Sequence, residues 1–228
     1  MLETLELIAR FCHLRVSDVA RAFAWSEHKA RRQLNSLERD KLLLSAERPE
    51  RTKVYGLSAR GRNYIKANSS QDVSCASSLR YLRSLGNYEH RCLANRVCLY
   101  YGDALSYSTE YEIQTGKAPV KSLFGKIPDA LIYTEQGAIW VEVERSKRNE
   151  ISWADLLHWF VLVFDPVYPE KPILSGQHDL YIFRLEFYCN RTFIQSFCNR
   201  LQAKVGEIRA KDLMDCYTVF TPLDFADY

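Results

Sequence analysis

Hydrophobic positions in the first 67 residues follow a helical spacing that changes once to a strand-like pattern. Apolar residues recur every three or four positions over 5–12, 16–23 and 30–37, which predicts three helices. Ser17 and Ser26 precede the second and third helix, where a serine hydroxyl can accept a hydrogen bond from a free backbone amide. Residues 42–45 and 53–57 are predicted strands around a polar turn, and a fourth helix begins at 58. The order is helix, helix, helix, hairpin, helix.

A small, polar segment at 68–80 predicts a linker, and the pattern changes after it. We expect a helix over 88–101, a tight turn at Gln136-Gly137, a helix from Asn149 and another over 192–208. The predicted strands are 105–113, 129–133, 138–145, 180–187 and 214–221. The second part therefore has the order α, β, β, β, α, β, followed by a helix and a strand. The chain is predicted to be α+β, with domains at 1–67 and 81–228.

Charge separates the same two parts. Residues 1–70 hold 14 Lys and Arg against 8 Asp and Glu, a net charge of +6, and the remainder holds 17 against 20, a net charge of −3. The basic excess predicts that the N-terminal part meets phosphate. The most apolar stretch has about nine residues, whereas a membrane span needs roughly twenty, and no signal peptide is apparent. Seven cysteines without a CxxC pair argue against a disulfide framework or a zinc ribbon, so we expect reduced thiols in a bacterial cytoplasm.

The N-terminal part resembles bacterial winged-helix regulators in the segments QLNSLERDKLL (33–43) and VYGLSARGRNYI (54–65), and in its charged hairpin tip. The resemblance implies that the third helix lies in the major groove of double-stranded DNA and that the hairpin wing contacts the backbone. The candidate groove residues are Lys29, Arg31, Arg32, Gln33 and Asn35, and the candidate wing residues are Arg48, Arg51 and Lys53. The alternatives are a solvated charged face and a winged helix that binds protein.

Three carboxylates are expected to meet at one end of the hairpin 128–145. Glu142 and Glu144 are two residues apart in a strand and project to the same face, and antiparallel pairing brings Asp129 opposite them. Such a cluster repels itself unless cations neutralise it. Oxygen ligands suit magnesium or manganese, which could generate hydroxide for attack on phosphorus. The alternative is a strand end whose carboxylates pair with Arg145, Lys147 and Arg148.

Pro128-Asp129 and Glu142-Val143-Glu144, together with the αβββαβ order over 81–187, resemble the PD-(D/E)XK nuclease superfamily. The resemblance implies that Asp129 and Glu142 are metal ligands. Glu144 stands where the family usually has lysine, which weakens the expectation of catalysis, and Lys147 is a candidate to replace it. Members often add a glutamate from the first helix or strand; the candidates are Glu89, Glu110 and Glu112, of which we select Glu110 as a metal ligand.

A closer resemblance is to the plasmid replication-relaxation family, which joins an N-terminal winged helix to a nuclease-like domain. Its motifs correspond to His90, Pro128-Asp129-Ala130 and Glu142-Val143-Glu144-Arg145. The resemblance implies a mobile-element role in plasmid replication, mobilisation or its control, and it makes His90 a catalytic candidate beside the alternative of a core or surface histidine.

Three functions stay open from the sequence. The first is a DNA-binding protein with a magnesium- or manganese-dependent endonuclease site at Asp129, Glu142 and Glu144. The second is a non-enzymatic regulator whose nuclease fold is catalytically silent and serves homodimerisation or partner binding. The third is an adaptor that contacts replication or mobilisation proteins through both domains.

Overall fold

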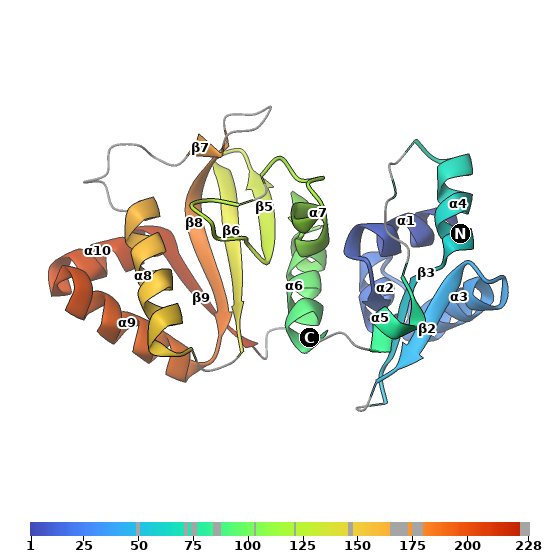
Figure 1. The fold of residues 1–228 in the computed structure, drawn as a ribbon, viewed down its shortest axis with the longest axis horizontal. Coiled ribbons are helices and arrows are strands. Elements are labelled where there is room, and N and C mark those ends of the chain that lie inside the picture. Colours follow the sequence, from blue (N-terminus) through green and yellow to red (C-terminus); the bar gives the residue numbers. More distant parts are fainter. Residues whose placement is uncertain are drawn as a thin grey trace. The chain divides into compact units, whose positions relative to one another are not determined.

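The computed structural model describes residues 1–48, 51–70, 73, 77–83, 88–102, 104–120, 122–145, 148–164, 173–174 and 180–223. The chain is mixed α and β, and it divides into two compact units, Met1–Gly102 and Asp103–Tyr228 (Figure 1). Over the described ranges, no helix has both the length and the apolar character that crossing a membrane requires. The cysteines in these ranges are free thiols.

The first unit combines six helices with a small antiparallel sheet in its described residues. The helices are α1 (Leu2–Phe11), α2 (Val16–Ala22), α3 (Glu27–Arg39), α4 (Ala59–Asn68), α5 (Leu79–Arg83) and α6 (Tyr88–Tyr101). The strands are β1 (Leu14–Arg15), β2 (Leu43–Glu47) and β3 (Lys53–Leu57), in the order β1-β3-β2. The predicted helices and hairpin are present. Strand β1 was not predicted, because two residues are too short to carry a periodic signal.

Helix starts in this unit depend on side-chain caps. Ser26 Oγ accepts from the backbone N of Lys29 at 3.3 Å, which confirms the cap predicted for α3. The predicted cap of α2 at Ser17 is wrong, because Ser17 lies inside the helix. Asp18 takes that role: its Oδ2 accepts from the backbone N of Arg15 at 2.8 Å and also binds the Arg15 guanidinium. A carboxylate that forms charge-assisted bonds outcompetes a neutral hydroxyl.

The core of the first unit forms where α1, α3 and α4 meet the hairpin. Leu5, Ile8, Leu34 and Leu57 are fully buried. Helix α4 approaches the hairpin so closely at Gly61 that a Cβ there would lie 2.1 Å from the carbonyl oxygen of Leu42. Only glycine permits that approach. The close contact holds α4 against the start of the hairpin at Leu42.

Helix α6 belongs to the first unit, although the sequence places it in the second domain. Tyr88 and Cys92 of α6 are buried in one cluster with residues of the hairpin and α5. Asn95 Nδ2 donates to the carbonyl oxygen of His13 at 3.2 Å. The compact unit therefore extends to Gly102 rather than ending at 67. Part of the predicted linker, residues 71–72 and 74–76, lies outside the described residues.

The second unit is built on a mixed sheet. Its strands are β4 (Ser106–Thr109), β5 (Ala130–Thr134), β6 (Gly137–Glu144), β7 (Ile173–Leu174), β8 (Leu180–Cys189) and β9 (Thr218–Pro222). The strand order is β4-β5-β6-β8, and β7 and β9 both pair with β8. Pairing is antiparallel from β4 to β6, whereas β6 runs parallel to β8 and β8 runs parallel to β9.

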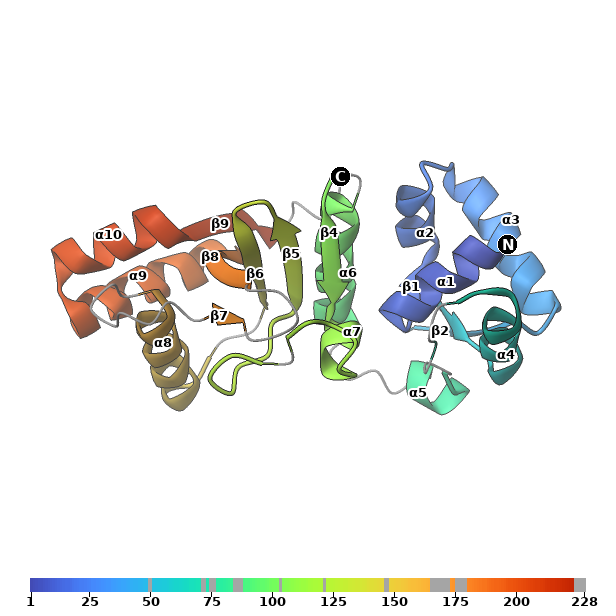
Figure 2. The ribbon, with the colours of Figure 1, turned by 90° about the horizontal axis from the view of Figure 1, so that it is seen from above.

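The helices in the described residues of this unit are α7 (Glu110–Gln114), α8 (Glu150–Phe164), α9 (Arg191–Val205) and α10 (Glu207–Tyr217). Helices α8, α9 and α10 lie on one side of the sheet (Figures 1 and 2). Trp140 of β6 is fully buried there, and its ring centroid lies 4.8 Å from that of Trp159 on α8. Phe187 of β8 packs against Phe193 and Phe197 of α9. The aromatic residues of α8 are therefore part of the core.

Several predicted boundaries in the second unit are wrong. The expected strand 105–113 ends at Thr109, because Thr109 and Glu112 cap α7 reciprocally: the Thr109 hydroxyl accepts from Glu112 N, and the Glu112 carboxylate accepts from Thr109 N. The helix predicted over 192–208 breaks at Gly206, which has a φ of 85°. The last strand begins at Thr218, not at 214, because α10 continues to Tyr217. The hairpin loop is Glu135-Gln136, since Thr134 already pairs with Gly137.

Candidate functional site

Helix α3 exposes one polar, mostly basic face in the first unit. Ala30, Leu34 and Leu37 are buried against the rest of the unit. The exposed side chains on the remaining surface of the helix include His28, Lys29, Arg31, Arg32, Asn35 and Arg39, and Gln33 is half-buried. The structure therefore brings the predicted groove residues together on one helix, on the side that its apolar contacts leave open.

The contacts of this face are weak enough to be exchanged. Arg31 Nη2 lies 3.9 Å from Glu27 Oε2, and both side chains are more than half exposed, so the pair contributes little to stability. Lys29 Nζ lies 4.3 Å from the centre of the Trp25 ring. Asn35 Oδ1 accepts from the Tyr55 hydroxyl at 3.2 Å, which links α3 to the hairpin. These contacts orient the face without burying its charge.

The hairpin cations differ from one another in their surroundings. Arg48 Nη1 donates to the carbonyl oxygens of Leu82 and Arg83 at 3.3 and 2.8 Å, and the guanidinium lies 4.6 Å from the centre of the Tyr88 ring. Arg48 therefore attaches α5 and α6 to the hairpin, a role that the sequence did not predict. Lys53 Nζ binds Glu38 Oε2 at 2.7 Å and ties β3 to α3. Arg51 is exposed at the hairpin turn.

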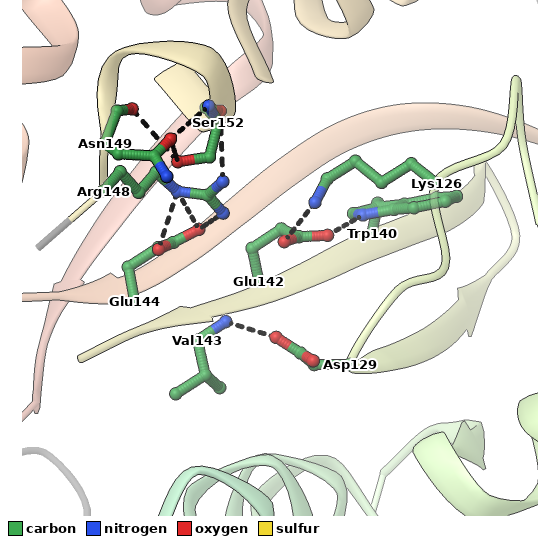
Figure 3. Close-up of polar contacts among 9 residues, drawn as sticks. All are labelled: Lys126, Asp129, Trp140, Glu142, Val143, Glu144, Arg148, Asn149 and Ser152. Carbon is green, nitrogen blue, oxygen red and sulfur yellow. Dashed lines mark hydrogen bonds and ion pairs between the residues drawn. The ribbon is translucent and has the colours of Figure 1, made fainter. Parts of the chain in front are cut away.

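In the second unit, Asp129 lies beside the end of β6, as the hairpin register predicts. Its backbone N donates to the carbonyl oxygen of Val141 at 3.0 Å, which extends the pairing of β5 and β6 by one residue. Its carboxylate Oδ2 accepts from the backbone N of Val143 at 2.7 Å (Figure 3). The aspartate is thus fixed to the strand that carries Glu142 and Glu144.

Glu142 is buried and holds two donors. Its side chain accepts from Lys126 Nζ at 2.7 Å and from Trp140 Nε1 at 2.5 Å (Figure 3). Burial and, to a lesser degree, the nearby charge of Asp129 raise the pKa of Glu142 to about 7, against the opposing effect of Lys126. Near neutral pH this carboxyl group therefore exchanges readily between its protonated and ionised forms.

Glu144 is also buried, and Arg148 neutralises it. Arg148 Nε lies 3.1 and 3.0 Å from the two carboxylate oxygens, and its Nη2 contacts one of them. Arg148 Nη1 also donates to the carbonyl oxygen of Ser152 at 3.3 Å, and Asn149 Oδ1 caps α8 by accepting from Ser152 N at 2.8 Å. This ion pair therefore connects the end of β6 to the start of α8.

Lys126 is a site residue that the sequence analysis missed. It closes a tight turn in which Leu123 N donates to Lys126 O at 2.8 Å and Lys126 N donates to Leu123 O at 3.0 Å. Trp159 Nε1 donates to Leu123 O at 3.0 Å and holds the turn against α8. Phe124-Gly125 is the turn signal that could have revealed a short hairpin, but no local pattern predicts that Lys126 reaches Glu142.

The remaining predicted residues are dispersed. Glu110 begins α7, and its carboxylate accepts from Gln114 at 2.6 Å. His90 is half-buried on α6, in the first unit rather than in the unit that carries Asp129. Arg145 is exposed, and Lys147 lies outside the described residues.

The arrangement of Asp129 and Glu142 does not fit a divalent cation as it stands. Both oxygens of Glu142 accept hydrogen bonds from side chains, and one of them contacts the ammonium group of Lys126. A cation would have to displace that ammonium group before it could use this carboxylate. In the part of the chain that the structure describes, no three His, Cys, Asp or Glu side chains are grouped so that they could hold a metal ion.

Comparisons of the chain with protein-family models, with curated proteins and with solved structures find no match.

Proposed function

We propose that this protein is a non-enzymatic regulator that binds double-stranded DNA through a winged helix in its first unit. The observation that carries the proposal is the exposed face of α3, on which Lys29, Arg31, Arg32 and Asn35 lie opposite a buried apolar face. Arginine can bind the O6 and N7 atoms of guanine with two hydrogen bonds, and asparagine can do the same with adenine. A helix with these side chains on its open side is suited to the major groove.

The elements around α3 support this role. Trp25 N donates to Ala20 O at 2.8 Å across the short turn between α2 and α3, and the stacked rings of Phe23 and Trp25 have centroids 4.6 Å apart. The turn therefore holds the two helices at a defined angle, as a helix-turn-helix requires. The hairpin β2–β3 follows α3 directly and presents Arg51, which is suited to a backbone phosphate.

For the second unit we propose a nuclease-like scaffold without catalytic activity. Its antiparallel β4, β5 and β6, followed by a parallel β8, support a relation to the PD-(D/E)XK fold. Lys126 neutralises Glu142 and Arg148 neutralises Glu144, so both acids act as buried structural partners. Such a scaffold would serve dimerisation or partner binding in the replication or mobilisation of a mobile element.

Salt dependence tests the DNA-binding proposal. We expect a mixed-sequence duplex to shift in electrophoretic mobility, with log K falling linearly with log salt by about 0.9 for each phosphate contacted. A slope equivalent to about three or more contacts would fit a helix and a wing that both meet the backbone. Absence of any shift at about 50 mM salt would contradict the proposal and favour an adaptor that contacts only proteins.

A metal-dependent endonuclease is the second candidate, and one observation favours it. The strand motif contains the two acids, Asp129 and Glu142, but lacks the lysine. Lys126 places a lysine ammonium group beside these acids from another segment of the chain. Supercoiled plasmid incubated with magnesium or manganese separates the candidates. We expect no nicking by the wild-type protein; nicking that disappears in both Asp129→Asn and Glu142→Gln would establish the endonuclease and overturn the silent scaffold.

A further inference from the structure

Asn35, on the exposed face of α3, is held by a buried tyrosine of the hairpin. The Tyr55 hydroxyl donates to Asn35 Oδ1 at 3.2 Å. Tyr55 is buried, whereas Asn35 is exposed. Tyr55 also pairs with Ser45 across the hairpin, so the register of two strands fixes its position. One side chain of the face that we propose for the groove therefore takes its orientation from β3.

The neighbours of Tyr55 determine which way this hydrogen bond runs. Burial raises the pKa of the Tyr55 hydroxyl, and Lys53 opposes the rise through its charge and a side-chain hydrogen bond. Lys53 Nζ lies 5.1 Å from the centre of the Tyr55 ring. An ammonium group can only donate, so the hydroxyl oxygen accepts from Lys53 and the hydroxyl proton is left for Asn35.

Glu38 holds the lysine in its turn. Lys53 Nζ lies 2.7 Å from Glu38 Oε2, and Ser45 Oγ donates to the other carboxylate oxygen. The bonds therefore form one connected chain from Glu38 through Lys53 and Tyr55 to Asn35, in which each bond polarises the next. Because Lys53 has only donors to offer, Asn35 receives a donor at the end of this chain, and its amide oxygen must be the atom that faces Tyr55.

The orientation of the Asn35 amide decides which base it can read. A contact with adenine uses both ends of an amide, since the oxygen accepts from N6 and the nitrogen donates to N7. Tyr55 turns the oxygen toward the hairpin, so Nδ2 is the end left for the DNA. Guanine presents two acceptors in the major groove, N7 and O6, whereas cytosine presents only a donor. An N–H group by itself is therefore matched to guanine and mismatched to cytosine.

We propose that Tyr55 is a positioning residue that makes Asn35 select guanine in the major groove. The inference rests on the proposed function, since it requires α3 to lie in that groove, and it names the base that one side chain reads. Tyr55 is buried and acts through Asn35. Lys53, which the sequence predicted as a phosphate contact of the wing, orients the Tyr55 hydroxyl instead.

Selection of duplexes from a random-sequence pool by the full-length protein, followed by sequencing, tests the inference. We expect the wild-type protein to enrich guanine at one position where Asn35→Ala loses all preference. Tyr55→Phe removes only the hydroxyl and frees the amide to turn. The ratio of guanine to adenine at that position should then fall about 2- to 10-fold, which corresponds to one hydrogen bond. Tyr64→Phe on α4 of the same unit is the matched control and should leave the ratio unchanged.

The variant Asn35→Asp separates orientation from general support of α3. The two carboxylate oxygens are equivalent, so an acceptor faces the groove whichever way the group turns. We expect this variant to enrich cytosine, whose N4 donates. Adding Tyr55→Phe to Asn35→Asp should leave the cytosine preference unchanged, which would also show that the double variant folds. Loss of that preference would mean that Tyr55 supports the helix itself, and it would overturn the positioning role.

Other results would overturn the inference too. They are a motif in which no position depends on Asn35, a base other than guanine at the position that does, or an unchanged ratio of guanine to adenine in Tyr55→Phe. Each of these results includes an enriched motif, so DNA binding by α3 would remain supported while the role of Tyr55 would not. No enriched motif with the wild-type protein would contradict both proposals.

Discussion

Replacing Arg31 and Arg32 together with alanine is expected to weaken binding to a specific duplex by about 100-fold or more. Both side chains are exposed on the open face of α3, where each can bind a guanine edge or a phosphate. A well-formed bidentate contact to a base contributes about 1–3 kcal/mol of discrimination, so two such contacts account for the loss. Fluorescence anisotropy with a labelled duplex measures the change in affinity.

The same variant should fold as the wild type does. The ion pair of Arg31 with Glu27 is exposed and contributes little, so the thermal midpoint should stay nearly unchanged. Lys204→Ala/Lys211→Ala is the matched control, because it removes the same charge from exposed positions on α9 and α10 of the second unit. An equal loss of affinity in this control would mean that net charge, and not α3, determines binding.

Replacing Lys126 with methionine is expected to lower the free energy of unfolding by about 3–5 kcal/mol at pH 9. The substitution keeps most of the apolar stem but leaves the buried Glu142 carboxylate without its cation, and the loss of one partner from a buried ion pair has a cost of this size. Urea unfolding followed by tryptophan fluorescence measures it, since Trp140, Trp153 and Trp159 all lie in the second unit.

The cost of this substitution should decrease at low pH. The pKa of Glu142 is raised from 4.5 to about 7 by burial, so between these values the folded protein holds a proton that the unfolded chain releases. The free energy of unfolding therefore falls as pH rises through this window. Loss of Lys126 raises the pKa of Glu142 in the folded protein further, because the positive charge that favours the ionised carboxylate is gone. The pH range in which the free energy of unfolding falls therefore extends to higher pH. At pH 5.5 Glu142 is protonated with or without Lys126, and we expect a cost of only about 1 kcal/mol.

A double variant checks this explanation. Lys126→Met/Glu142→Gln removes both charges, so it should be more stable than Lys126→Met at pH 9, and it should lack the fall in the free energy of unfolding that Glu142 causes as pH rises from 4.5 to about 7. Equal destabilisation by Lys126→Met at pH 5.5 and pH 9 would contradict the buried ion pair and indicate lost packing instead.

Local signals in the sequence predicted the features that neighbouring residues determine. The helical spacing of Ala30, Leu34 and Leu37 predicted which side of α3 is buried and therefore which side is exposed. Strand alternation and a tight turn placed Asp129 beside the end of β6. Both inferences needed only the periodicity of one element or the register of one hairpin.

Features that depend on contacts between distant segments were not predicted. Arg48 bonds the carbonyl oxygen of Arg83, and Asn95 bonds that of His13, 82 positions away in the sequence. These contacts place α6 in the first unit, although the linker-like composition of 68–80 suggested a boundary before it. Lys126 likewise reaches Glu142 because a turn and α8 position it, and no pattern within 115–128 encodes that pairing.

Selection of duplexes from a random-sequence pool, followed by sequencing, is the first measurement to make on DNA recognition by α3. We expect the wild-type protein to enrich a motif, and Arg32→Ala to relax this motif at one or two neighbouring positions while the flanking preference remains. Arginine at a base edge specifies that base, whereas arginine at a phosphate would weaken binding to all sequences alike. No enriched motif with the wild-type protein, or the same motif with every α3 variant, would contradict sequence recognition by α3.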